Sequence, residues 1–206
     1  MADTPADIRP DLKIVADWIA PNSRVLDIGC GDGTLLAYLG REKGVDARGI
    51  EIRRAKVNRC VAAGPPVIRG DANSDLSLYP TDSFDYVLLT QTLQAVEQPR
   101  TVLEELIRVG TRAVVSIPNF GFWRIRLSLL FNGHMPVTKT LDQPWYETKN
   151  IHLCTIQDFL DLVKEMGLII EDAVVLKPDG TPARSPVASQ RANLWGEQAI
   201  FLLRRK

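Results

Sequence analysis

Apolar positions along the chain follow two periods in turn, and this alternation predicts strands separated by helices. Five short apolar runs are typical of buried strands, at 24–29, 45–52, 66–71, 84–90 and 112–118. Four segments carry apolar residues at helical spacing instead, at 11–20, 33–44, 53–63 and 99–109. Apolar strands joined by helices predict a parallel sheet that is covered on both faces.

The C-terminal part of the chain predicts one more helix and two more strands. An amphipathic helix follows Thr155, with Thr155 and Asp158 placed as a capping pair and Gly167 at its end. Residues 168–177 and 197–205 then have the apolar pattern of strands. We expect these two strands to form an antiparallel pair at the edge of the sheet.

The connection at 178–196 is rich in proline, serine, alanine and glycine, and we expect no helix in it. Its length suits either a surface loop or a contact with a partner. The sequence has no internal repeat and no linker between two cores. We interpret residues 1–206 as a single doubly wound α/β domain that begins with a leading helix within 1–22.

Composition and charge argue against several classes of partner. Lysine plus arginine (25) equals aspartate plus glutamate (25), so the overall charge gives no reason to expect nucleic acid or an anionic membrane. The N-terminal segment carries acids where a signal peptide needs positive charge. No apolar run approaches the roughly 20 residues of a membrane span. We expect a cytoplasmic protein without a nucleic-acid or membrane partner.

The cysteines and histidines do not predict a metal site. Cys30, Cys60 and Cys154 are odd in number and form no C-x-x-C pair, which favours free thiols over disulfides or zinc ligands. His134 and His152 are isolated in the sequence. We therefore expect no metal ion.

A glycine-rich loop follows the first predicted strand, in the segment "VLDIGCGDG". It has glycine at every second position, at Gly29, Gly31 and Gly33, with Asp27 and Asp32 among them. The dinucleotide-binding pattern is G-x-G-x-x-G, and its pyrophosphate group requires bare amides at a helix N-terminus. Two acids would repel pyrophosphate but attract an ammonium or sulfonium group. The loop therefore predicts a pocket with a negatively charged rim and a cationic ligand.

Two further acids stand at the ends of the next strands. Glu51, 18 residues after Gly33, is placed to accept hydrogen bonds from both hydroxyls of a ribose. Asp71 can accept from an exocyclic adenine amine while the amide of Ala72 meets a ring nitrogen. A cationic amino-acid end, a ribose and an adenine together describe S-adenosylmethionine.

Several motifs resemble those of known families. "VLDIGCGDG", "GIEI", "GDA" and "FDYVLLTQTL" resemble the motifs of class I S-adenosylmethionine-dependent methyltransferases over about 24–117. "RPDLKIVADWI", "TQTLQAV", "IPNFGFWRIRLSLLFNGHMPVTK" and "WYETKNIHLCTI" resemble the MetW methionine-biosynthesis family along nearly the whole chain. The resemblance implies a Rossmann-like methyltransferase domain whose seven-stranded sheet is mostly parallel, with an antiparallel C-terminal edge pair.

The resemblance also implies a binding site for S-adenosylmethionine or S-adenosylhomocysteine. Asp27 and the glycine loop would hold the methionine part, Glu51 the ribose, and Asp71 with Ala72 the adenine. Thr90 and Gln91 would lie beside the reactive end. The implied site comprises Asp27, Gly29, Cys30, Gly31, Gly33, Glu51, Ile52, Asp71, Ala72, Thr90 and Gln91.

Two functions from different classes remain open. The resemblance favours an accessory protein that acts with or activates a MetX-type homoserine O-acyltransferase, and S-adenosylmethionine could then act as a feedback signal. The alternative is an active methyltransferase on an unidentified small-molecule acceptor. Gln91 and Gln94 can orient a polar group but cannot act as a general base, which leaves His152 as the candidate base. A dehydrogenase is a third alternative.

Residues 118–154 are rich in aromatic side chains and interrupt the regular alternation. We interpret them as an insertion that forms a lid or a docking surface, because aromatic residues and arginine dominate interface hot spots. The aromatic residues are Phe120, Phe122, Trp123, Phe131, Trp145 and Tyr146.

Overall fold

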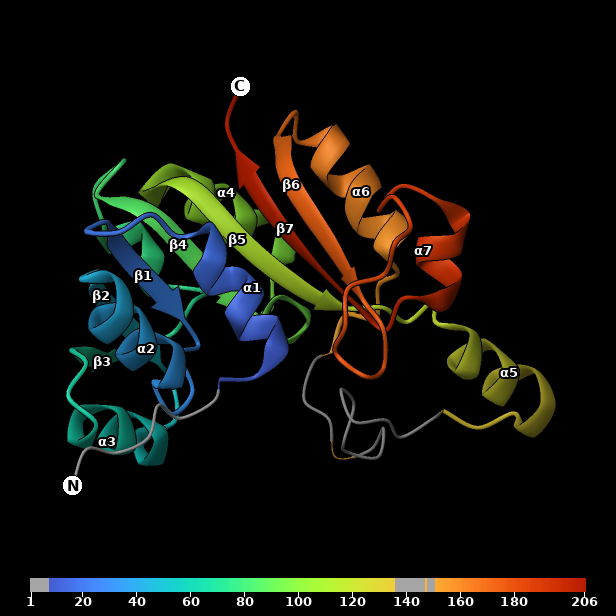
Figure 1. Cartoon of the computed structure of the whole chain (residues 1–206), viewed down its shortest axis with the longest axis horizontal. Coiled ribbons are helices and arrows are strands. Elements are labelled where there is room, and N and C mark those ends of the chain that lie inside the picture. Colours follow the sequence, from blue (N-terminus) through green and yellow to red (C-terminus); the bar gives the residue numbers. More distant parts are fainter. Residues whose placement is uncertain (1–7, 136–146, 148–150) are drawn as a thin grey trace.

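A computed structural model describes residues 8–135, 147 and 151–206. Within these residues, seven strands form one sheet in the order β3-β2-β1-β4-β5-β7-β6 (Figure 1). The strands are β1 (Arg24–Ile28), β2 (Asp46–Glu51), β3 (Val67–Arg69), β4 (Phe84–Thr90), β5 (Gly110–Pro118), β6 (Ile169–Leu176) and β7 (Gln198–Arg204).

Helices connect these strands and cover both faces of the sheet (Figure 1). The α-helices are α1 (Pro10–Trp18), α2 (Thr34–Lys43), α3 (Arg54–Ala62), α4 (Pro99–Val109), α5 (Trp123–Asn132), α6 (Ile156–Glu165) and α7 (Gln190–Trp195). Two short 3-10 helices, η1 (Asp75–Leu78) and η2 (Leu93–Ala95), flank β4 in the sequence. None of the helices in the described part of the chain is long and apolar enough to cross a membrane.

The direction of the strands confirms the predicted fold class. Strands β3, β2, β1, β4 and β5 run parallel to one another, whereas β7 pairs antiparallel with both β5 and β6. The chain moves outward from β1 in one direction through β2 and β3, and then in the other direction through β4 and β5. The strand order therefore reverses between β1 and β4, which is where α/β sheets bind ligands.

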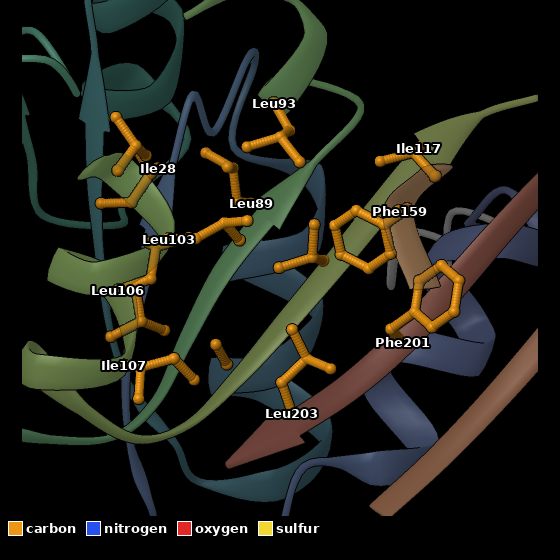
Figure 2. Packing of buried hydrophobic residues seen from close by; sticks show 14 of the residues in the cluster. Ile28, Leu89, Leu93, Leu103, Leu106, Ile107, Ile117, Phe159, Phe201 and Leu203 are labelled. Carbon is orange, nitrogen blue, oxygen red and sulfur yellow. The ribbon is translucent and has the colours of Figure 1, made fainter. Parts of the chain in front are cut away.

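Both faces of the sheet are buried, as unbroken apolar strands require. Along β4, Val87 and Leu89 belong to the core beneath α4 and α6, whereas Tyr86 and Leu88 belong to the core beneath α1 and α2. Figure 2 shows Leu89 beside Leu103 of α4 in the first of these cores. Alternate strand residues point to opposite faces, so each face needs its own apolar set.

Helix α6 is held at both its start and its inner face. The Thr155 hydroxyl accepts a hydrogen bond from the Asp158 amide at 3.2 Å, and the Asp158 carboxylate accepts from the Thr155 amide at 2.8 Å. This is the predicted capping box. Phe159 packs on Phe201 of β7 with ring centroids 4.5 Å apart (Figure 2). The cap and the aromatic pair together position α6 on the sheet.

The prediction that 178–196 contains no helix is wrong. Helix α7 occupies six residues, and the hydroxyl of Ser189 caps it by accepting from the amide of Ala192 at 3.1 Å. Serine is common in loops but is also a preferred N-cap, and here Ser189 starts a helix. The rest of the connection before α7 is turn and bridge structure.

A second helix, α5, was not predicted within 118–154. Its ten residues follow β5, and its end projects away from the sheet (Figure 1). Phe122 just before it is buried, whereas Phe131 near its end is exposed. Trp145 and Tyr146 lie outside the described residues.

The capping box predicts a measurable contribution to stability. We expect Thr155→Val, which removes the hydroxyl and keeps the side-chain shape, to lower the free energy of unfolding by about 1 kcal/mol. Urea unfolding followed by circular dichroism measures this change. Lys164→Ala, an exposed change on the same helix, should alter stability far less. Equal effects of the two substitutions would contradict a stabilising cap.

Candidate functional site

A cavity of about 770 Å³ lies at the carboxyl ends of the first four strands, where the strand order reverses. This volume is within the range of about 300–1,000 Å³ that is typical of small-molecule sites. Ten of the eleven predicted site residues line it: Asp27, Gly29, Cys30, Gly31, Glu51, Ile52, Asp71, Ala72, Thr90 and Gln91. The structure therefore brings together residues that are far apart in the sequence.

The three loop glycines all have positive φ, but they differ in what surrounds them. A Cβ atom on Gly29 (φ +73°) would lie 2.7 Å from the Thr92 hydroxyl oxygen. A Cβ atom on Gly31 (φ +64°) would meet only the ammonium of Lys56, at 3.8 Å. Gly33, the eleventh predicted residue, caps α2 and does not line the cavity. Gly31 thus faces the open space, whereas Gly29 and Gly33 shape the loop.

Asp27 at the end of β1 is a buried carboxyl group without a complete set of partners. The residue is 2% exposed, and its Oδ1 atom has no hydrogen-bond partner among the described residues. Burial raises the pKa of Asp27 to about 8, with a further contribution from the charge of Glu51. The carboxyl group is therefore largely protonated at neutral pH until a cation or a hydrogen-bond donor approaches it.

Glu51 at the end of β2 ties the second strand to the glycine loop. It is 4% exposed, and its Oε2 atom accepts a hydrogen bond from the Gly31 amide at 3.1 Å. Its Oε1 atom accepts from the Arg53 amide at 2.8 Å. Each carboxylate oxygen has a second lone pair. Glu51 can therefore hold the loop and still accept hydrogen bonds from a ligand.

The segment after β3 supplies one wall of the cavity. The Oδ1 atom of Asp71 accepts from the backbone amide of Asn73 at 2.9 Å and from its side-chain amide at 2.8 Å. The amide of Asp71 donates to Asp75 at 2.9 Å. This turn fixes Asp71 and Ala72 on the cavity wall, with the Oδ2 atom of Asp71 outside these contacts.

Gln91 after β4 connects the cavity to two other elements. Its backbone has φ +50°, which is rare for a residue other than glycine, and its amide donates to the hydroxyl of Ser116 at 2.9 Å. Its side-chain amide donates to Gln198 of β7 at 3.1 Å and to Asp11 of α1 at 3.4 Å. These contacts hold the start of α1 beside the cavity, where Arg9 joins the lining.

Two predicted residues contribute mainly apolar surface. Cys30 is buried in the loop, and burial raises the pKa of its thiol well above the usual range. Ile52 is exposed at the edge of the cavity. Cys30, Cys60 and Cys154 are free thiols. The described ranges contain no cluster of three or more residues that could hold a metal ion.

The structure does not bring His152 into the cavity. His152 is exposed, its amide donates to the carbonyl of Gln94 at 2.8 Å, and it is not a lining residue. The described residues between 118 and 154 also contribute nothing to the lining. The structure therefore does not place the candidate base at the cavity, and the described part of 118–154 forms no lid over it.

Four basic residues in the lining were missed, and they correct the expectation of a negative rim. Arg9 and Arg53 have side chains 60% and 70% exposed, and Lys56 and Arg59 also line the cavity. The cavity therefore has a buried acidic floor and a mixed rim. Arg53, Lys56 and Arg59 stand at intervals of three, a helical spacing that could have indicated their common face.

The sheet order and the glycine-loop cavity define a class I S-adenosylmethionine-dependent methyltransferase fold. A methyltransferase from Thermotoga maritima, described as a possible histamine N-methyltransferase, matches with a TM-score of 0.67 and 18% identity, over 96% of this chain and 88% of that one. A methyltransferase from Mesorhizobium loti matches with a TM-score of 0.66 and 21% identity, over 95% and 96%.

The chain belongs to the family of the methionine biosynthesis protein MetW, whose family model matches residues 9–203. It is 33% identical over 197 residues to the bifunctional methionine biosynthesis protein MetXA/MetW of Rhodopirellula baltica, covering 86% of this chain and 32% of that protein. It is 29% identical over 96 residues to a 2-methyl-6-phytyl-1,4-hydroquinone methyltransferase of Synechocystis, covering 45% and 30%. The chain thus spans about a third of the length of these curated relatives.

Asp27 predicts an unusual dependence of stability on pH. Its pKa is 3.8 ordinarily and about 8 in the folded protein, so the stability provided by the protonated carboxyl is lost as pH rises from about 4 through about 8. Asp27→Asn cannot ionise. We therefore expect it to be more stable than the unaltered chain at about pH 9, with a smaller difference at about pH 5. Urea unfolding at both pH values measures this.

Asp32→Asn provides the matched control for Asp27→Asn. Asp32 lies in the same loop, but its hydrogen bond with the Thr34 side chain holds its pKa below the usual value. Asp32→Asn should therefore lose stability at about pH 9 rather than gain it. A difference between Asp27→Asn and the unaltered chain that stays constant across this pH range would rule out a raised pKa for Asp27.

Proposed function

We propose that this chain binds S-adenosylmethionine or S-adenosylhomocysteine in the cavity and acts in the cytoplasm as an accessory subunit of a MetX-type homoserine O-acyltransferase. In this role it supports methionine biosynthesis. The observation that carries the ligand assignment is the buried carboxyl group of Asp27, whose Oδ1 atom lacks a partner among the described residues.

The methionine end of the ligand fits the acidic floor. A buried acceptor without a hydrogen-bond partner destabilises the folded chain by about 1–3 kcal/mol. A ligand donor that forms a hydrogen bond with Asp27 removes this cost, which favours binding. The α-ammonium group of S-adenosylmethionine is such a donor, and its positive charge also favours the ionised carboxylate. The open space beside Gly31 gives this end of the ligand room against the loop backbone.

The other two parts of the ligand have matching partners. The second lone pairs on the Glu51 carboxylate can accept hydrogen bonds from the ribose hydroxyls. The Oδ2 atom of Asp71 can accept from the adenine amine, and the backbone of Ala72 lies on the same wall. Glu51 ends β2 and Asp71 follows the neighbouring strand β3, so the two acids lie next to each other along the cavity wall.

The partner assignment rests on the relative in which two functions share one chain. The Rhodopirellula protein is bifunctional by its name, MetXA/MetW, and this chain matches about a third of it. A fused pair of domains meets at high effective concentration, which favours a working contact between them. We propose that the same contact forms here between separate chains.

Methyl transfer to a small acceptor is the second candidate function. The polar side chain of Gln91 lines the cavity beside Thr90, at the expected reactive end of the ligand. Formation of S-adenosylhomocysteine on incubation with S-adenosylmethionine and a pool of metabolites, followed by chromatography, would favour this candidate.

Glu51→Gln tests the ligand assignment. The substitution keeps the side-chain size but removes the charge, and we expect it to weaken binding of S-adenosylmethionine by about tenfold or more. Isothermal titration calorimetry measures the dissociation constant. Glu42→Gln, on an exposed acid of α2 outside the cavity, is the control and should bind as the unaltered chain does. Absence of binding by the unaltered chain, or equal binding by Glu51→Gln, would refute the assignment.

The accessory role is tested on the acyltransferase itself. We expect the homoserine O-acyltransferase of the same organism to co-purify with this chain and to acylate homoserine faster in its presence. A coupled assay of coenzyme A release, with and without an equimolar amount of this chain, measures the effect. An acyltransferase that is fully active alone and does not co-purify would exclude the accessory role.

A further inference from the structure

Helix α5 exposes an unusual number of large apolar side chains. Among its ten residues Ile125 is buried, whereas Leu130 and Phe131 are 73% and 75% exposed. Leu127 and Leu129 are also exposed, and Met135 follows them. Exposed apolar groups that gather on one element mark an interaction surface.

The apolar surface continues from α5 onto α7. Trp123 lies edge-on to the buried Phe122, with ring centroids 5.9 Å apart, and 5.7 Å from the ring of Trp195. Trp195 at the end of α7 is itself 54% exposed. We call the set Leu127, Leu129, Leu130, Phe131, Met135 and Trp195 the α5 patch.

A buried asparagine holds the base of this patch in place. The side-chain amide of Asn119 donates to the carbonyls of Asn193 and Gly196 at 2.8 and 2.7 Å. Its oxygen accepts from the amides of Gly121 and Ile156 at 2.9 and 3.2 Å. One side chain therefore joins the segments that begin α5 and α6 to α7. A surface that is ordered before binding loses less conformational entropy on binding.

The charges around the patch favour a different protein over a second copy of this chain. Helix α5 carries Arg124 and Arg126 and no acidic residue, and Arg191 on α7 is exposed. A two-fold contact between copies would place the same surface of each against the other, and so bring these arginines together. A partner with an apolar groove and an acidic edge fits both features.

We infer that the α5 patch is the surface that docks the homoserine O-acyltransferase. This inference rests on the proposed function and adds the place of contact. The partner is inferred from the fused Rhodopirellula relative, because this chain matches 32% of that protein and the rest lies outside the matched region. The position of α5 is compatible with this role. Helix α5 follows the carboxyl end of β5, and the cavity also lies at the carboxyl ends of the parallel strands. The docked enzyme would therefore approach the end of the sheet at which the cavity opens, without covering the cavity itself.

The test replaces the two most exposed apolar residues of α5. We expect Leu130→Ser combined with Phe131→Ser to weaken binding of the full chain to the purified acyltransferase by about tenfold or more, measured by surface plasmon resonance. Leu78→Ser is the matched control, because Leu78 is 79% exposed on η1 and lies outside the patch. Arg124→Glu should also weaken binding and reduce its sensitivity to salt.

The possible outcomes distinguish an error in the α5 patch from an error in the proposed accessory role. Loss of binding in the double variant, with S-adenosylmethionine affinity and circular dichroism unchanged, supports the α5 patch. Equal binding by the double variant and the unaltered chain overturns the patch alone. No binding by the unaltered chain overturns the accessory role and the patch together. A dimer of the chain that dissociates in the double variant, seen by light scattering, assigns the patch to self-association and overturns the inference.

Discussion

The hydrogen bond from the amide of Gly31 to the carboxylate of Glu51 joins the first and second strands at the ligand site. It fixes the glycine loop over the end of β2, and it brings the buried charge of Glu51 near Asp27. Burial is the main cause of the raised pKa of Asp27, and the nearby charge of Glu51 raises it further. The site therefore holds two carboxyl groups that are poorly compatible without a ligand. A cation placed near both carboxyl groups would stabilise their charged forms, which is a physical reason for the proposed cationic ligand.

Much of the fold follows from the sequence because its strands are buried on both faces. The unbroken apolar run of β4 indicates a strand in the middle of the sheet, because its residues pack into the cores on both faces. The capping pair of α6 is predictable because it depends only on residues close together in the sequence. The composition of 178–196 does not predict α7, because serine and proline are common in loops whereas Ser189 here caps a helix. Helix α5 was missed because few of its apolar residues are buried, so it lacks the periodic pattern of a core helix.

The candidate site could be predicted in part for a related reason. The acids and the alternating glycines follow successive strands of a parallel sheet, whose carboxyl ends meet at one place, so the residues that form the floor of the cavity could be identified from the sequence. The basic rim was not, because Arg53, Lys56 and Arg59 resemble the charged face of any surface helix. The backbone conformation of Gln91, and its contacts with Asp11 and Gln198, depend on elements that meet only in the folded chain.

The single reversed strand determines how other domains can be attached. Because β7 runs antiparallel to its neighbours, it starts at Gln198 near the cavity and ends at the opposite ends of the strands, where the C-terminus lies (Figure 1). Arg9, just ahead of α1, instead lines the cavity. A domain fused ahead of α1 would emerge at the end of the sheet that carries the cavity, within reach of a short linker, whereas a domain fused after β7 would be directed away from the cavity. The topology thus gives the two termini of the domain unequal roles in any larger polypeptide.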